Sequence, residues 1–432
     1  MKLNRLILIV LIFICFFNNE FTLGLIDKTI NLDVFTKIII FISLFVVVLN
    51  YQFVFKRFKI WLVILIIMLL SLVIQSQIEY HVLFVYPHVY FKLLIIFVLL
   101  ATYTLASKIE ANYLDLFSKI IILFYLFDLF ILGWINYYSP LSLFDVDPSI
   151  GGAGDSRVFH ANIVYLFILP FLYYYAKYLK ERKSNFLALS IIIGLILLFQ
   201  NHRSIWVSAA IALLSLTYLY IKSVAPSRYF SIGIIIPITA ISLTIFFGIV
   251  FYKATSIFEE RLSDIINWRA QGTGLWRYEQ VESYLPFIYN NIIWGLRFGG
   301  FEFPTLGPAS GSFQSGTGHH FHNGIIDIIF YHGLIGLFLV YGIIIFILYK
   351  LYRKKNKDLT DIISFSFLFA AIPFSFAYNL PLAFWGITGV MATFTSVDNI
   401  RKGINRKKKY CSKQKCLYKT YIKDDLHSNP CI

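Results

Sequence analysis

The chain has 432 residues, of which 58% are apolar and only 14% are charged. Ordinary globular chains have about 45–50% apolar and about 25% charged residues, so this composition excludes a water-soluble fold of this length. The net charge of +15 suits nucleic acid, anionic lipid or the basic loops of a membrane protein, and the distribution of charge decides among these classes.

Twelve apolar segments predict twelve transmembrane helices, because a span needs about 20 consecutive apolar residues. We interpret the first as a retained helix, since no small-residue cleavage site of a signal peptide follows it. The predicted fold class is an all-α polytopic membrane protein. The segments lie at about 5–17, 34–55, 60–76, 85–106, 114–136, 158–179, 185–200, 204–221, 229–251, 324–350, 359–377 and 380–397.

The basic residues predict the orientation of these spans. With both termini in the cytoplasm, 27 of the 38 Lys and Arg residues fall in cytoplasmic segments, ten of them in the tail. Cytoplasmic loops carry such an excess, so the charge reflects topology and does not indicate nucleic-acid binding. The chain then divides into spans one to nine (1–251), an external loop (252–323), spans ten to twelve (324–397) and a basic cytoplasmic tail (398–432).

The cysteines predict neither a disulfide framework nor a metal site. Cys15 lies in the first span, and Cys411, Cys416 and Cys431 lie in the cytoplasmic tail. Together with His427, the tail cysteines fit no standard zinc-finger spacing, and a solvated basic tail near anionic lipid is the preferred interpretation. No cofactor is predicted.

The external segment 252–323 is far longer than loops normally run without a function. Trp268, Trp276, Trp294 and nine glycines make it too aromatic for a disordered linker. We therefore expect short amphipathic helices and glycine turns lying over the outer face of the membrane.

Three candidate catalytic residues fall on the predicted outer face, namely Arg203, Arg277 and His322. Arg203 lies in the turn after the seventh span, Arg277 in the long loop, and His322 directly before the tenth span. Two permanent cations and a group that titrates near neutral pH suit a phosphate-bearing substrate. The ordinary alternatives are an interfacial side chain for Arg203, an ion pair with Glu279 or Glu282 for Arg277, and a helix-start residue for His322.

These residues lie in segments that resemble one family. The run from His322-Asn323 to Gly333-Leu334-Ile335-Gly336 resembles the His-Asn and Gly-Leu-Ile-Gly signature of the O-antigen ligase and polysaccharide repeat-unit polymerase superfamily. Three further segments, over roughly 150–350, resemble the same family in the same order: Ser156–Asn162, Asn201–Trp206 and Trp294–Phe301.

The resemblance implies a membrane glycosyltransferase with a GT-C-like helical fold, in the bacterial cytoplasmic membrane and with its active site on the outer face. It would transfer a glycan from undecaprenyl pyrophosphate to a sugar hydroxyl without a metal. Guanidinium groups stabilise charge on a departing pyrophosphate, and a neutral His activates a hydroxyl. Arg203 and Arg277 are therefore the expected clamp and His322 the expected base.

Neighbouring residues are candidates for substrate binding. Arg269 and Arg297 are alternatives to Arg277, because Leu275-Trp276 stand where the family has Thr-Gly directly before the arginine. For the adjacent loop histidines His319 and His320 we prefer a solvated pair over a metal site, since no carboxylate lies beside them in sequence. The remaining candidates are Arg157, His160, Trp206, His320 and Asn323.

Buried charges and glycines predict helix contacts. Lys92 and Asp128 lie roughly 10–12 Å inside the outer ends of adjacent spans, which favours a structural ion pair over a proton relay. Asp327 is a weaker candidate to orient His322. Gly333 and Gly336 predict close packing or a bend in the tenth span.

Within this class a polymerase is preferred over a ligase, because polymerisation occurs with many kinds of surface glycan while ligation to a lipid A-core needs one particular acceptor. A transporter or flippase is disfavoured, since the halves show no repeat and the candidate charges lie away from the midplane. The implied partners are the lipid-linked donor, a sugar acceptor, membrane lipids, a chain-length regulator and a flippase.

Overall fold

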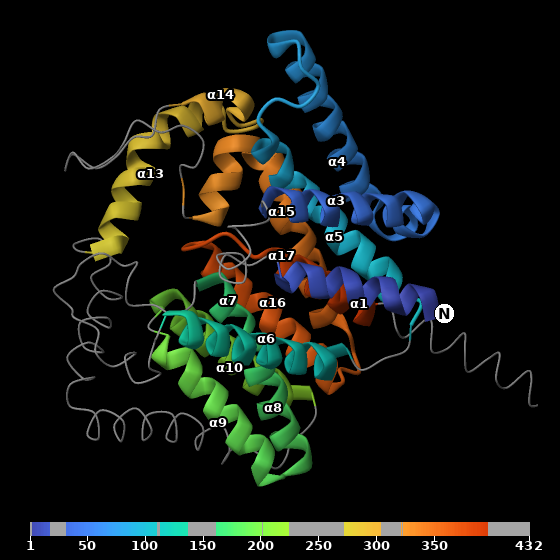
Figure 1. Ribbon diagram of the computed structural model, residues 1–432, viewed down its shortest axis with the longest axis vertical. Helices are drawn as coiled ribbons and strands as arrows, with labels where there is room; N and C mark the ends of the chain where they lie inside the picture. The colour runs from blue at the N-terminus through green and yellow to red at the C-terminus, as the bar shows by residue number, and fades with distance from the viewer. Residues whose placement is uncertain are drawn as a thin grey trace, which may run out of the picture.

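The computed structural model describes residues 2–17, 32–109, 113–136, 161–200, 202–223, 272–303, 321 and 323–395. Every regular element within these residues is a helix (Figure 1), so the all-α prediction is confirmed for this part of the chain. Among the described residues, four helices are long and apolar enough to cross a membrane: α4 (Tyr51–Tyr80), α5 (Pro87–Ala106), α10 (Arg203–Ser223) and α15 (Gly324–Arg353).

Eleven of the twelve predicted spans overlap these helices or others in the described ranges, and the segment 229–251 lies outside them. The count of twelve spans therefore stays a prediction. The other helices in predicted spans are α1 (Lys2–Phe17), α3 (Leu32–Leu49), α6 (Tyr113–Asn136), α7 (Ala161–Leu166), α8 (Ile168–Glu181), α9 (Ser184–Phe199), α16 (Leu359–Ser375) and α17 (Leu382–Phe394).

Three predicted segments differ from the structure. The span expected at 34–55 ends at Leu49, where the Asn50 side chain donates to Val46 O at 2.8 Å. The basic segment 56–59, expected to be a loop, is helical with a kink at Phe58, because Lys and Arg are good helix formers. The sixth predicted span is broken at Phe167 into α7 and α8.

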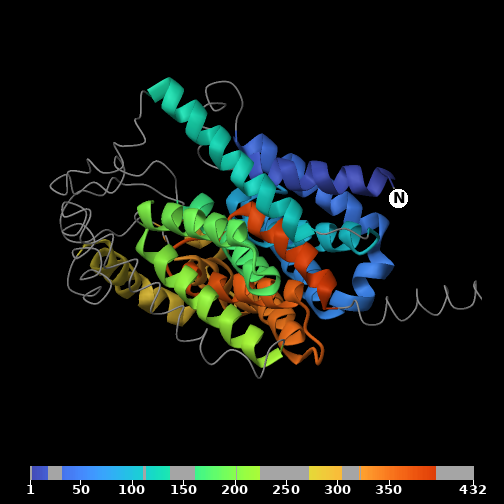
Figure 2. The same cartoon turned by 90° about the horizontal axis from the view of Figure 1, so that it is seen from below.

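The helices form two packed groups (Figure 1 and Figure 2). In one group α5 packs along α17 and also contacts α1, α3, α4 and α15. In the other, α10 packs along α16, while α8 packs against α9 and α6. The α5–α17 contact is close, because a Cβ on Gly389 would overlap the Leu99 carbonyl and the Thr102 hydroxyl.

Helix ends that the charge pattern placed in the cytoplasm meet one another. Lys108 donates to Asn50 Oδ1 at 2.6 Å, which joins the end of α5 to the end of α3. Arg57 donates to Thr395 Oγ1 at 2.6 Å, which joins α4 to the end of α17. These contacts agree with the predicted alternation of the spans.

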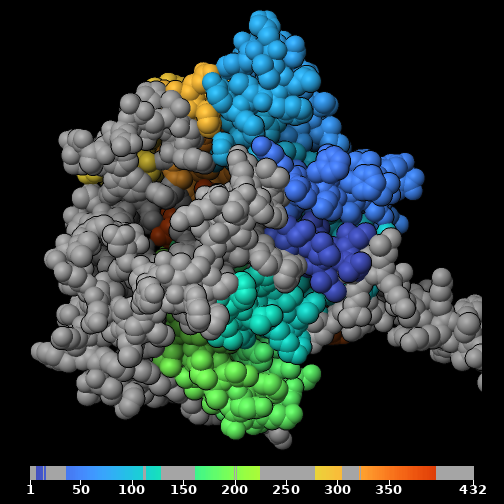
Figure 3. Space-filling model, in the orientation of Figure 1, coloured from blue at the N-terminus to red at the C-terminus, as the bar shows by residue number. Residues whose placement is uncertain are grey.

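The outer face of α4 is covered by exposed apolar side chains. Ile66, Leu70, Ile74 and Ile78 are each at least 44% exposed. In Figure 3 this helix projects from the rest of the molecule. An apolar surface of this kind is solvated by hydrocarbon, so α4 has the character of a lipid-facing helix.

Two helices lie within the predicted external loop: α13 (Gly272–Asn290) and α14 (Arg297–Glu302). The turn between them contains Gly295 with φ +72°. Helices and a glycine turn are therefore confirmed for residues 272–303, although α13, with 19 residues, is longer than the short helices expected. Their place over the outer face of the membrane stays a prediction. Tyr284 anchors α13 to the start of α15, because its ring packs on Phe321 and Phe330 at 4.9 and 5.4 Å between centroids.

Candidate functional site

The turn 291–296 is inserted into an interruption of α15. The interruption lies at Gly333, whose φ of +62° and ψ of −162° suit glycine alone. In an unbroken helix Leu334 N would donate to Phe330 O. Here Leu334 N donates to Ile292 O at 2.8 Å, and Phe330 O accepts from Leu296 N at 2.8 Å. The turn thus satisfies the backbone groups that the break releases.

Glycines on both sides make this insertion possible. A Cβ on Gly333 would overlap the Ile293 carbonyl, and a Cβ on Gly295 would overlap the backbone of Tyr331 and His332. The bend predicted at Gly333 is confirmed. Two motif segments of the sequence, Trp294-Gly295 and the Gly-Leu-Ile-Gly run, therefore form one interlocked unit.

A buried ion pair ties the first turns of α15 to α5. Asp327 pairs with Lys92, and the two side chains are 4% and 15% exposed. The Lys92 ammonium also lies 4.6 Å from the centre of the Tyr331 ring. The His332 Nε2 atom is 2.9 Å from Val89 O, which adds a second contact between the two helices. This end of α15 is held on α5 by charge as well as by packing.

The sequence analysis pairs Lys92 with Asp128, whereas in the structure α5 packs against α15 and this contact brings Asp327 to the lysine. A contact of Lys92 with Asp128 stays a prediction. The Asp128 side chain itself lies outside the described residues. The Asp327 carboxylate is engaged with Lys92, while its suggested contact with His322 involves a residue outside the described ranges and stays a prediction.

Residues on both sides of His322 are anchored. Phe321 is buried and packs on Phe330, with ring centroids 5.1 Å apart. Asn323 is the N-cap of α15, and its side chain accepts from the amides of Ile325 and Ile326 at 3.1 Å. The Asn323 side chain, predicted to bind substrate, therefore has a capping role in this structure.

Arg203 and Trp206 lie at the start of α10, directly after the short turn that the sequence predicts. The Arg203 side chain is half-buried. The Trp206 indole donates to Leu198 O at 3.2 Å, which holds it against α9. Nearby, the Gln200 amide donates to the Tyr125 hydroxyl at 3.3 Å, so polar side chains gather at this end of the helices.

Arg297 is the loop arginine whose surroundings the structure describes most fully. It is half-buried, with φ +52°, and its Nη1 donates to Gln75 Oε1 at 3.1 Å. The guanidinium lies 5.0 Å from the centre of the Trp294 ring. Burial lowers the pKa of Arg297, while the nearby charge of Glu79 raises it. Burying a permanent cation is unfavourable unless an anionic partner compensates for the lost hydration.

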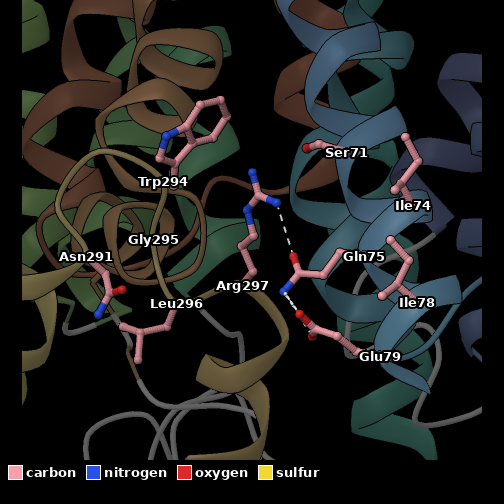
Figure 4. Close-up of a pocket in the computed structure, with 10 residues that line it drawn as sticks. All are labelled: Ser71, Ile74, Gln75, Ile78, Glu79, Asn291, Trp294, Gly295, Leu296 and Arg297. Atoms are coloured by element: carbon pink, nitrogen blue, oxygen red, sulfur yellow. Dashed lines mark hydrogen bonds between the residues drawn. The ribbon is translucent and has the colours of Figure 1, made fainter.

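An open pocket of about 550 Å³ lies beside this guanidinium, between α4 and the turn (Figure 4). Sequence reasoning did not single out its α4 residues Gln75 and Glu79, because polar residues are ordinary at the end of an apolar segment. The lining residues are Ser71, Ile74, Gln75, Ile78, Glu79, Asn291, Trp294, Gly295, Leu296 and Arg297.

The candidates are distributed over both helix groups. Arg203 begins α10, which packs on α16, whereas Arg297 begins α14, which packs on α5 and α15. Arg277 lies in α13, but its side chain is outside the described set. Also outside the described ranges are His322, Arg157, His160, Arg269 and His320.

No cluster of three or more His, Cys, Asp or Glu side chains that could hold a metal ion occurs within the described ranges. The cysteines of the predicted tail lie outside those ranges, and Cys15 is buried in α1 as a free thiol.

No curated protein matches the chain. Residues 187–341 match the sequence model of a family described as O-antigen ligase. The matched range runs from α9 past the interruption of α15, and it contains Arg203, Arg277 and His322. Over this part of the chain the match confirms the resemblance seen in the motifs, and the segment Ser156–Asn162 lies outside it.

Proposed function

We propose that the protein polymerises undecaprenyl-pyrophosphate-linked oligosaccharide repeat units into a surface polysaccharide, such as an O-antigen, capsule or exopolysaccharide. The reaction takes place on the outer face of the bacterial cytoplasmic membrane, with both termini in the cytoplasm. The observation that carries the proposal is the match over residues 187–341, which includes all three candidate catalytic residues.

Arg203 and Arg277 bind the pyrophosphate in this proposal. The bond between the anomeric carbon and the pyrophosphate oxygen breaks, and negative charge grows on the leaving group. Fixed guanidinium groups stabilise that charge, and Arg203 lies at the N-terminal end of α10, where the helix dipole adds positive potential. Because these cations supply the charge that a metal supplies elsewhere, we expect activity to survive chelation of divalent ions.

His322 takes the proton of the acceptor hydroxyl as the new bond from that oxygen to the anomeric carbon forms. The anchored neighbours Phe321 and Asn323 and the Lys92–Asp327 pair support this role, since they fix the chain on both sides of the histidine. A base on a rigid support keeps its geometry toward the substrate.

The proposal is tested by deleting the gene and complementing the deletion strain with single variants. Loss of a polymerase leaves single repeat units on the surface acceptor. We expect His322→Ala to reduce polymerisation about 10²-fold or more, and Arg203→Ala or Arg277→Ala to abolish it. Arg353→Gln changes an exposed arginine at the opposite end of α15 and is the matched control. Full glycan with His322→Ala would remove that residue from the mechanism.

The same experiment separates the alternatives. A ligase is the second candidate because the matching family is described as O-antigen ligase, and its loss leaves long chains stranded on the lipid carrier. A flippase defect would prevent lipid-linked units from reaching the outer face, whereas an Arg277 transfer defect leaves them there. Unchanged glycan in both pools after deletion would contradict all three functions.

A further inference from the structure

The pocket between α4 and the turn 291–297 lies on a lipid-facing surface. Its α4 wall includes Ile74 and Ile78, which are 58% and 69% exposed, and its other wall includes Trp294, which is 46% exposed. α4 is one of the candidate membrane spans, and these residues lie near its end. A hydrocarbon chain beside α4 would therefore place its polar headgroup at the level of this pocket.

Arg297 gives the pocket a cation with spare hydrogen-bonding capacity. Within the described part of the chain no carboxylate forms an ion pair with it, and its buried Nε has no hydrogen-bond partner. Trp294 on one side and Gln75 on the other fix the plane of the guanidinium (Figure 4). A half-buried, oriented guanidinium of this kind is suited to a phosphate group.

Glu79 gives the same pocket a negative charge, and Gln75 lies between this carboxylate and the Arg297 guanidinium. The Gln75 amide nitrogen donates to both Glu79 carboxylate oxygens at 3.1 Å, while the Gln75 oxygen accepts from Arg297. One amide group thus separates the two charges, as Figure 4 shows. A purely anionic headgroup would neutralise Arg297 but leave its own charge near Glu79, which is unfavourable.

We infer that this pocket binds the headgroup of an ammonium-bearing membrane phospholipid, such as phosphatidylethanolamine. Its phosphate contacts Arg297, its primary ammonium contacts Glu79, and an acyl chain lies against Ile74 and Ile78. A primary ammonium donates hydrogen bonds to a carboxylate, whereas the quaternary ammonium of choline cannot. The proposal concerns lipid binding alone, and its test does not depend on glycan transfer.

Native mass spectrometry of the full-length protein in detergent tests this inference. The protein is mixed with equal amounts of phosphatidylethanolamine, phosphatidylglycerol and phosphatidylcholine, and the retained lipids are counted. We expect wild type to retain phosphatidylethanolamine about tenfold more than the other two, as the loss of one charge-assisted contact predicts. Arg297→Gln should reduce retention of phosphatidylethanolamine about tenfold. Glu79→Gln should keep phospholipid binding but remove the preference over phosphatidylglycerol.

Arg353→Gln is the matched control, because Arg353 also stacks on an aromatic ring, Tyr349 at 5.9 Å, but at an exposed position. It should leave retention unchanged. Glu79 is exposed, so its variant keeps the test decisive even where Arg297→Gln fails to fold. Equal retention of the three lipids by wild type, or an unchanged preference in Glu79→Gln, would overturn the inference. Displacement of phosphatidylethanolamine by undecaprenyl pyrophosphate would also overturn it and assign the pocket to the donor. All readouts measure binding, so an absence of polymerase activity does not affect them.

Discussion

The α5–α15 region and the α10–α16 region, which carry Arg297 and Arg203 respectively, are held together in different ways. Around α15, backbone meets backbone: the turn 291–296 bonds into the break at Gly333, and positions that tolerate only glycine make the contact possible. Around α10, buried side chains such as Leu216 and a hydrogen bond from the Tyr220 hydroxyl to Leu179 O make the contacts. The first region depends on backbone conformations, so substitutions there should cost more than substitutions around α10.

Gly333→Ala should have the largest effect on stability. The new methyl group would overlap the Ile293 carbonyl, and alanine is strained at φ +62°. Steric overlap and backbone strain together should lower the free energy of unfolding by about 3 kcal/mol or more. The measurement is thermal and denaturant-induced unfolding in detergent.

Gly299→Ala is the control for this substitution, since a Cβ there meets no atom within 4 Å. It should unfold like wild type. If both variants were equally stable, the interlock would not be the feature that holds this region together.

Breaking the Lys92–Asp327 pair should have an effect of similar size to that of Gly333→Ala. Lys92→Met leaves a buried carboxylate without its partner, which typically costs about 3–5 kcal/mol. The double variant Lys92→Met/Asp327→Leu should recover most of that loss, because no isolated charge remains. Unfolding of both single variants and the double variant gives the coupling energy. An additive cycle, with no recovery, would show that the two charges do not interact.

Asn323→Ala tests the cap of α15. Loss of the side chain that accepts from Ile325 N and Ile326 N should lower stability by about 1 kcal/mol. Asn323→Ser retains an oxygen that can accept and should recover stability. If activity falls in Asn323→Ser while stability is restored, the asparagine also contacts substrate, as the sequence interpretation proposed.

The smallest effect is expected in the α10 region, for Trp206→Phe. This change removes the indole hydrogen bond, which Leu198 O and Leu197 O share as acceptors, and retains an aromatic ring, so we expect a loss of about 0.5 kcal/mol. Glycan transfer should be retained if the tryptophan only packs against α9. A loss of transfer at wild-type stability would instead support its predicted part in substrate binding.

Apolar runs in the sequence predicted most of the described helices, because burial in hydrocarbon imposes length and composition directly. The two glycines of the tenth span predict close packing or a bend, and the structure has the bend at Gly333. The ion-pair partner of Lys92 could not be predicted from the sequence, since an ion pair between spans depends on which helices are neighbours. The helical state of 56–59 was missed because a charge cluster was taken to end a helix. The roles of Arg277 and His322 stay predictions.

The insertion of the turn into α15 also sets which parts of this chain can be exchanged. The segment 291–296 and the segment 330–335 supply hydrogen bonds to each other that neither obtains from its own neighbours in sequence. A chimera that takes the external loop from a related protein must therefore take the first twelve residues of α15 (324–335) with it. Transplanted alone, either segment would leave backbone N–H and C=O groups without hydrogen-bond partners. The loop and the start of α15 therefore have to be exchanged together, as one structural unit.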